Sequence, residues 1–302
     1  MFFIFGSPRS GTTLLAQCLN AHPDVIVPHE TDFIIPSAFV FDRVTDPALR
    51  AVILKPLITG SQGFTMGLGE YLSADEVCSI VDRHSGSLAE LLTAIYGALT
   101  ERAVAKLAGD KSPNDLLFLR MLLKLGGIPK DAKVIHLVRD VRAVVTSIAA
   151  HKLAPGIERV FARLWCSSNL LLYDELNGTA QYQLIRYEDF VREPTRSLGM
   201  LCKHLQISTA SISKMLDPDR RHPRYRGWSN HARLYDPITL QEDHSCRDAH
   251  VIALCERQAA EALAVFGYDG HSPRSRPTPR QPQPGALSRA LRFLALSPGG
   301  KR

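Results

Sequence analysis

Short apolar runs alternate with amphipathic stretches along most of the chain. The apolar run at 2–5 leads into a glycine-containing turn, and residues 12–21 then show helical spacing. Further strands are predicted at 25–27, 132–138 and 181–187, of which AKVIHLV at 132–138 is the clearest. Strands that alternate with helices indicate an α/β fold with a parallel sheet and right-handed crossovers.

The clearest helix is predicted over residues 87–107. It begins with Ser87 at the N-cap and Glu90 at the capping-box position. The stretch 32–83 is broken by prolines and glycines, so helices joined by loops are expected there. GDKSPN at 109–114 has the residue types of a turn. Other helices are predicted at 114–124, 139–152, 157–176 and from Pro194 onward.

The composition divides the chain into two parts. Residues 1–270 are expected to form one domain, and 271–302 are rich in proline and arginine. This tail holds seven basic residues and no acidic ones, so its charge of +7 exceeds the net charge of +6 of the whole chain. The high pI therefore gives no sign of a nucleic-acid partner. The tail is predicted to be disordered, either as a solvating segment or as a weak contact with a membrane surface through its RALRFLAL stretch.

The sequence shows neither a recognisable targeting signal nor paired cysteines. The start MFFIFGSPRSG resembles no leader, and no run of apolar residues is long enough for a membrane span. The six cysteines show no C-x-x-C spacing and are expected to be reduced thiols. We therefore expect a soluble, cytoplasmic protein.

The stretch FIFGSPRSGTTLL at 3–15 is almost a nucleotide-binding P-loop. Gly6 and Gly11 have the right spacing, but Thr12 stands where G-x-x-x-x-G-K-[ST] has lysine, and the nearest cation is Arg9. The backbone amides and the helix start still favour an anion, and Thr12 and Thr13 add hydroxyls. Losing the lysine argues against ATP hydrolysis.

A second candidate site follows the strand at 132–138. Arg139 stands at the strand's carboxyl end, where α/β sheets bind ligands, and Ser147 lies eight residues further on. Spacing alone also allows Arg139 to be a surface ion-pair partner of Asp140. Asp140 itself allows a rival interpretation, a P-loop kinase or nucleotide hydrolase that would use it to hold a metal.

Taken together, several motifs resemble the sulfotransferases that use 3′-phosphoadenylylsulfate (PAPS). PRSGTTLL at 8–15, HET at 29–31, DKSP at 110–113 and the Arg139-x7-Ser147 pair carry the resemblance, which extends in order over residues 2–268. It is strongest to the arginine-loop branch, which includes tyrosylprotein sulfotransferases and bacterial enzymes. The resemblance implies a P-loop-like parallel sheet flanked by helices. It also implies transfer of a sulfonate from PAPS to a hydroxyl or amine, with PAP as product and without a metal.

The resemblance also assigns donor-binding residues. Arg9, Ser10, Gly11, Thr12 and Thr13 are expected to form the 5′-phosphosulfate loop, with Arg9 beside the sulfonate. The 3′-phosphate is expected to bind Arg139 and Ser147, and the nucleotide also contacts Tyr187. Two contacts depart from the family pattern or stay open. His151, followed by Lys152, stands where a further arginine is common, and Ser229 and Asn230 are two open candidates for a C-terminal nucleotide contact.

For catalysis the resemblance implies that Glu30 is the base, with Arg9 and Lys111 stabilising charge on the bridging oxygen. His29 is a rival base, because imidazole suits proton transfer near neutral pH. A non-catalytic PAP-binding protein is a further alternative, disfavoured by the presence of all three catalytic residues. No motif names the acceptor. Carbohydrate, glycolipid, phenol and peptide hydroxyls all stay open, and a small molecule, a carbohydrate or a glycolipid is expected. The lack of a leader is taken to disfavour tyrosine sulfation in the secretory pathway.

Overall fold

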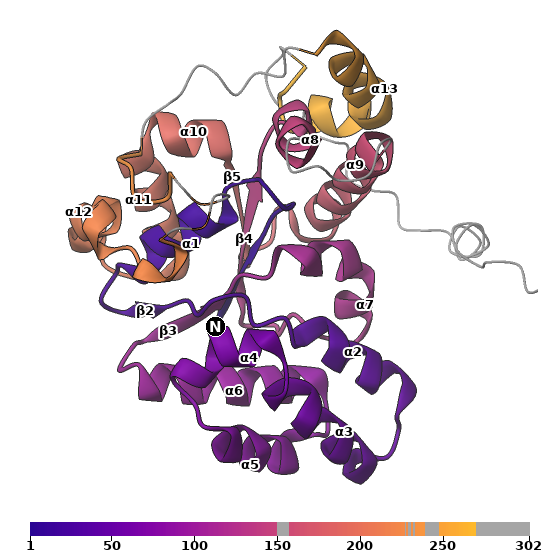
Figure 1. Cartoon of the computed structure of the whole chain (residues 1–302), viewed down its shortest axis with the longest axis vertical. Helices are drawn as coiled ribbons and strands as arrows, with labels where there is room; N and C mark the ends of the chain where they lie inside the picture. Colours follow the sequence, from indigo (N-terminus) through magenta and orange to yellow (C-terminus); the bar gives the residue numbers. More distant parts are fainter. Residues whose placement is uncertain (150–156, 227, 229–230, 232, 239–247, 270–302) are drawn as a thin grey trace, which may run out of the picture.

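Five strands form a single parallel sheet in the order β2-β3-β1-β4-β5 (Figure 1). This computed structural model describes all residues except 150–156, 227, 229–230, 232, 239–247 and 270–302. The strands are β1 (Phe2–Phe5), β2 (Val25–Ile26), β3 (Leu107–Asp110), β4 (Lys133–Val138) and β5 (Tyr182–Arg186).

The central strand β1 lies at a switch point of the topology. It pairs with β3 on one side and with β4 on the other, so that Phe2 lies opposite both Gly109 and Lys133. The chain leaves β1 toward β2 on one side, whereas β4 continues to β5 on the other. Loops that diverge in this way open a crevice beyond the carboxyl ends of the strands, where such sheets bind ligands.

Helices cover both faces of the sheet because the apolar run of β1 is buried on both sides. Phe2 and Ile4 pack with helices of one face, and Phe3 and Phe5 with those of the other. The first face carries α1 (Thr12–Asn20), α11 (Pro194–Leu205), the 3-10 turn η3 (Thr209–Ser211) and α12 (Ile212–Leu216). Beyond the end of β4 pack α8 (Val141–Ala149), α9 (Ile157–Leu176) and α13 (Ala249–Val265), and α10 (Tyr187–Arg192) follows β5 directly.

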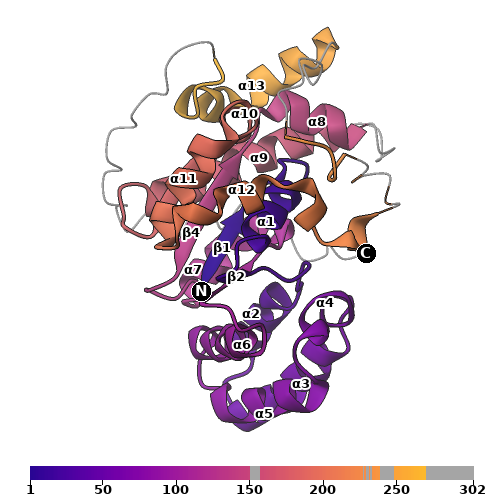
Figure 2. The same ribbon diagram turned by 90° about the vertical axis from the view of Figure 1, so that its left-hand side faces the viewer.

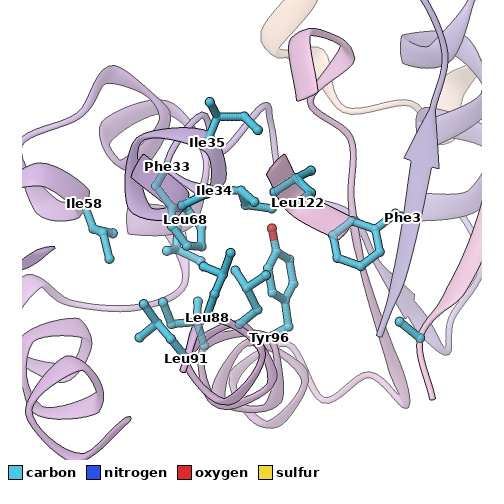
Figure 3. Close-up of a cluster of buried hydrophobic side chains, with 14 of the residues drawn as sticks. Phe3, Phe33, Ile34, Ile35, Ile58, Leu68, Leu88, Leu91, Tyr96 and Leu122 are labelled. Carbon is cyan, nitrogen blue, oxygen red and sulfur yellow. The ribbon is translucent and has the colours of Figure 1, made fainter. Parts of the chain in front are cut away.

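A helical lobe fills the chain between β2 and β3 and lies below the sheet in Figures 1 and 2. Its apolar core continues into the sheet through Phe3, and Figure 3 shows Phe33 and Tyr96 among the side chains gathered there. The lobe consists of α2 (Ile34–Arg43), α3 (Pro47–Thr59), α4 (Gln62–Met66), η1 (Leu68–Glu70), α5 (Ala74–His84) and α6 (Leu88–Arg102). The remaining short elements are η2 (Pro113–Phe118), α7 (Leu119–Lys124), η4 (Pro218–Arg220) and η5 (Pro223–Tyr225).

The predicted parallel α/β sheet flanked by helices is confirmed, including the helices between 32 and 83. One strand was missed. The helix predicted to reach residue 107 ends at Arg102, and β3 begins at Leu107 where helix and turn were expected. Val104 has a left-handed φ of 53°, which reverses the chain and lets four residues enter the sheet beside β1.

The boundary predicted at residue 270 and the tail at 271–302 lie outside the described residues. Within the described part of the chain, no helix has both the length and the hydrophobicity needed to cross a membrane. The cytoplasmic location stays a prediction.

Candidate active site

The loop between β1 and α1 has the geometry of an anion cradle. Gly11 is the N-cap of α1 with φ 91°, and a Cβ there would lie 2.5 Å from the ring of Tyr187. The Ser10 amide donates to the Ser7 carbonyl over 3.1 Å and closes the turn. The Ser10 hydroxyl is completely buried and has no hydrogen-bond partner among the described residues. A buried hydroxyl of this kind fits a loop built to bind an anion.

Arg9 joins the two predicted donor-binding segments. Its Nε donates to Ser147 Oγ over 3.0 Å, and Arg139 Nη1 donates to the Arg9 carbonyl over 2.9 Å. Arg139 and Ser147 therefore both contact Arg9, Arg139 at its carbonyl and Ser147 at its side chain. Burial and the charge of Arg139 lower the pKa of Arg9.

Tyr187, the first residue of α10, closes the cradle from the side of β5. Its ring lies against Gly11, and the Arg139 guanidinium carbon is 4.6 Å from the ring centroid. The neighbouring Glu188 fixes this position by accepting from the Asp140 amide over 3.0 Å and from the Tyr268 hydroxyl over 2.6 Å. This anchor could not be read from the sequence, because Tyr268 is distant along the chain.

Lys111 connects the donor loop with the predicted base. Its Nζ donates to Glu30 Oε1 over 2.6 Å and to Thr13 Oγ1 over 3.3 Å. The Lys111 side chain is 1% exposed and that of Glu30 is 28% exposed. A buried ammonium thus faces a carboxylate that solvent, or an acceptor, can reach.

The backbone around Glu30 is held by its neighbours. Thr31 Oγ1 donates to Asp110 Oδ1 over 2.7 Å, and the Tyr96 hydroxyl donates to the same oxygen over 2.5 Å. Asp110 is the last residue of β3, so these bonds fix the Glu30 loop next to Lys111. Helix α4 also approaches closely, since a Cβ on Gly63 would lie 2.0 Å from the Thr31 carbonyl oxygen.

Aromatic rings gather beside Glu30. The His29 ring stacks on Tyr225 at 5.4 Å between centroids, and Trp228 lies edge-on to His29 at 5.9 Å. His231 packs edge-on against Tyr225 at 5.0 Å. Burial and the charge of Lys111 lower the pKa of His29, and burial together with Lys111 and Arg9 lowers that of His231 to about 4. Both imidazoles are therefore neutral at neutral pH.

Sequence reasoning missed Tyr225, Trp228 and His231 as site residues. The aromatic spacing of RYRGWSNH was the available signal, but it does not show that this segment packs against His29. Four positions left open by the sequence, His151, Lys152, Ser229 and Asn230, lie outside the described residues.

The rival kinase interpretation depended on Asp140 as a metal-holding acid. In the structure, both oxygens of this carboxylate accept from Arg142, whose Nη2 donates to Oδ2 over 2.6 Å. The Arg142 amide also donates to Oδ1 over 2.8 Å. Asp140 is therefore engaged in its own turn and is not directed at the loop after β1.

Comparison with known proteins agrees with this geometry. The profile of the sulfotransferase family matches residues 2–211. The chain belongs to this family. Protein-tyrosine sulfotransferase 1 of Danio rerio is 30% identical over 213 residues, 68% of this chain and 53% of that protein. The Drosophila melanogaster protein-tyrosine sulfotransferase is 26% identical over 218 residues, 68% of this chain and 38% of that protein. The chain thus spans about half or less of the length of these two relatives.

Solved structures show the same fold. The sulfotransferase domain of the Synechococcus PCC 7002 olefin synthase has a TM-score of 0.52 and 23% identity, covering 85% of this chain and 93% of that one. The sulfotransferase domain from the curacin biosynthetic pathway has a TM-score of 0.54 and 19% identity, covering 85% and 96%.

The expected acceptor was wrong. A small molecule, carbohydrate or glycolipid was predicted, whereas the curated relatives are named as protein-tyrosine sulfotransferases. The error has a physical origin: the motifs that carry the resemblance are assigned to donor binding and catalysis, and they do not constrain the surface that receives the acceptor. The start of this sequence carries no weight for or against a tyrosine acceptor.

Proposed function

We propose that this sulfotransferase moves the sulfonate group of PAPS to the phenolic hydroxyl of a tyrosine in a protein acceptor and releases PAP. The observation that carries the proposal is the position of Lys111. Its ammonium bonds both Thr13 of the donor loop and Glu30 of the neighbouring loop, so one buried cation lies between donor and acceptor sides.

In this reaction the bond between sulfur and the bridging phosphate oxygen breaks while the phenolic oxygen bonds to sulfur. Glu30 takes the phenolic proton as general base, which its partial exposure permits. Lys111 then moves its hydrogen bond toward the negative charge that grows on the bridging oxygen. Arg9 and Arg139 hold the phosphates of PAPS. The buried Ser10 hydroxyl donates a further hydrogen bond to them.

The tyrosine acceptor is supported by two independent observations. The curated relatives are named for it. In addition, His29, the residue before the proposed base, packs with the rings of Tyr225 and Trp228. Aromatic surfaces bind a planar ring by offset or edge-on packing, at roughly 0.5–1.5 kcal/mol per pair beyond area burial.

Binding by calorimetry tests the donor. The purified chain should bind PAP more tightly than AMP or ATP, and Arg139→Ala should remove that preference. Equal affinity for PAP and AMP in the wild type would refute PAPS as donor.

Transfer of radiolabelled sulfonate from PAPS tests the acceptor. The substrates are three peptides that differ at one position, Tyr, Ser or Phe. Label should enter the Tyr peptide alone. Label in the Ser peptide at a comparable rate would refute selection of a phenol.

A further inference from the structure

A buried chain of polar side chains runs from the donor loop into the core. His136 on β4 and Asn169 on α9 are both completely buried. His136 Nδ1 is 2.7 Å from the Tyr182 hydroxyl, and His136 Nε2 is 2.8 Å from Asn169 Oδ1. Asn169 Nδ2 donates to Ser7 Oγ over 3.2 Å. The chain thus links β5 at the sheet edge with the loop after β1.

The direction of these hydrogen bonds follows from one backbone group. Asn169 Nδ2 also donates to the Trp165 carbonyl over 2.6 Å, and a carbonyl can only accept. The amide NH2 therefore serves Trp165 and Ser7, and the amide oxygen faces His136 Nε2. That nitrogen must carry the ring proton, because an amide oxygen cannot donate. His136 Nδ1 then accepts from the Tyr182 hydroxyl. The ring holds a single proton because burial lowers the pKa of His136 to about 4.

The chain leaves the proton of the Ser7 hydroxyl available. Ser7 Oγ accepts from Asn169, and no described residue accepts the proton of Ser7. Ser7 is 3% exposed, so water does not readily supply an acceptor. A buried hydroxyl proton without an acceptor is unfavourable, and an anion held in the loop would satisfy it.

The next residue gives a reason for a side-chain donor at this position. P-loops bind phosphate largely through successive backbone N–H groups. Pro8 has no N–H, so the loop lacks one such donor directly after Ser7. The Ser7 hydroxyl is adjacent in the chain and can replace it.

We propose that Ser7 donates a hydrogen bond to the 5′-phosphate group of the bound nucleotide, and that Asn169 is a positioning residue that directs this donor. Asn169 does so by occupying the acceptor side of the Ser7 oxygen. The inference rests on the proposed use of PAPS, and it adds a binding residue and its buried support to that site.

Calorimetric titration with PAP and with adenosine 3′-monophosphate tests the proposal, since the second ligand lacks the 5′-phosphate. Ser7→Ala should weaken PAP binding about tenfold or more, as expected for a hydrogen bond to a charged group. It should leave the affinity for adenosine 3′-monophosphate within about twofold. Ser37→Ala is the matched control, because Ser37 on α2 is a completely buried serine whose hydroxyl has no partner among the described residues. Its affinity for PAP should equal that of the wild type.

The role of Asn169 is tested through its coupling to Ser7. Asn169→Leu should weaken PAP binding in the wild-type background and should add nothing in the Ser7→Ala background. If this variant does not fold, Asn169→Asp replaces it. Its carboxylate accepts the Ser7 proton, so PAP binding should weaken at least as much as in Ser7→Ala. Effects of Asn169→Leu and Ser7→Ala that simply add would leave Asn169 with a structural role only and overturn its positioning role.

Two results separate this inference from the proposed function. The inference about Ser7 is wrong, while PAPS as donor stands, if the wild type binds PAP and Ser7→Ala binds it equally well. The same holds if Ser7→Ala lowers the affinities for PAP and for adenosine 3′-monophosphate by the same factor. If the folded wild type does not bind PAP, the proposed donor is wrong and the inference is overturned with it.

Discussion

Replacing Glu30 by glutamine separates proton transfer from donor binding. Glutamine keeps the size of the side chain, and its carbonyl oxygen can still accept the hydrogen bond that Lys111 donates over 2.6 Å. The amide cannot take a proton from the acceptor. Because a positioned general base contributes about 10²–10⁴ to the rate, kcat should fall by about that factor. The Kd for PAP should stay within about fivefold, since exchanging a charged for a neutral acceptor of one hydrogen bond at a partly exposed site costs about 1 kcal/mol.

The stability of this variant should fall measurably. The Lys111 ammonium is buried, and it loses a charged partner but keeps its hydrogen bonds to Thr13 and to the new amide. A charged hydrogen bond is worth about 1.5–3 kcal/mol and a neutral one about 1 kcal/mol, so we expect about 0.5–2 kcal/mol of destabilisation. Urea denaturation measures this difference, and single-turnover transfer to the Tyr peptide measures the chemical step.

His29→Phe is the matched control for Glu30→Gln. Phenylalanine preserves the stacking on Tyr225 at 5.4 Å but removes both ring nitrogens. Its kcat should stay within about tenfold of the wild type. A Glu30→Gln variant that keeps most of its activity while His29→Phe loses it would make His29 the base. Loss of PAP binding in Glu30→Gln would instead give Glu30 a structural role.

Three further results are expected. Gly11→Ala should abolish PAP binding and cost at least about 1–2 kcal/mol of stability. Gly11 has a φ of 91°, and an added Cβ would collide with the Tyr187 ring. Gly178→Ala is the control, because Gly178 has a similar φ of 83° but an added Cβ would meet nothing within 4 Å. It should lower stability in urea denaturation without changing PAP binding in calorimetry. Arg139→Ala should raise the Kd for PAP about 10- to 150-fold and leave that for AMP nearly unchanged; a parallel loss for both nucleotides would contradict a 3′-phosphate contact. The folded pKa of His136, about 4, lies below its ordinary value of 6.5, so the unfolded chain binds more protons between these pH values. The free energy of unfolding should therefore be unaffected by His136 above pH 6.5 and fall by about 3 kcal/mol as the pH decreases to 4, and a His136→Phe variant with the same pH dependence would contradict this.

The sequence was most informative where chemistry and chain order coincide. The donor loop, the strand at 132–138 and the pair Arg139 and Ser147 each lie within one continuous segment, so glycine spacing and apolar runs predict their placement. Lys111 and Glu30 were found only through resemblance. Their contact depends on β3 lying between β1 and β2, and this strand is four residues long with an interior glycine.

Contacts between distant segments could not be predicted. Asn169 reaches Ser7 from α9, and Tyr268 reaches Glu188 from the end of α13, with no local pattern at either residue. A buried asparagine in a helix looks like any other polar position along an amphipathic sequence. Its role becomes visible only when the sheet order brings α9 beneath the loop after β1.

The arrangement of the two arginines supports the proposed donor, a ligand with two anionic groups. Arg139 donates to the Arg9 carbonyl, and its charge contributes to the lowered pKa of Arg9. Two nearby guanidinium groups, one of them half-buried, repel each other unless anions lie between or beside them. A P-loop with a lysine places one cation among the phosphates, whereas here the Arg9 side chain bonds Ser147 and the Arg9 carbonyl bonds Arg139. A nucleotide with phosphate at both 5′ and 3′ positions would relieve the repulsion from both sides.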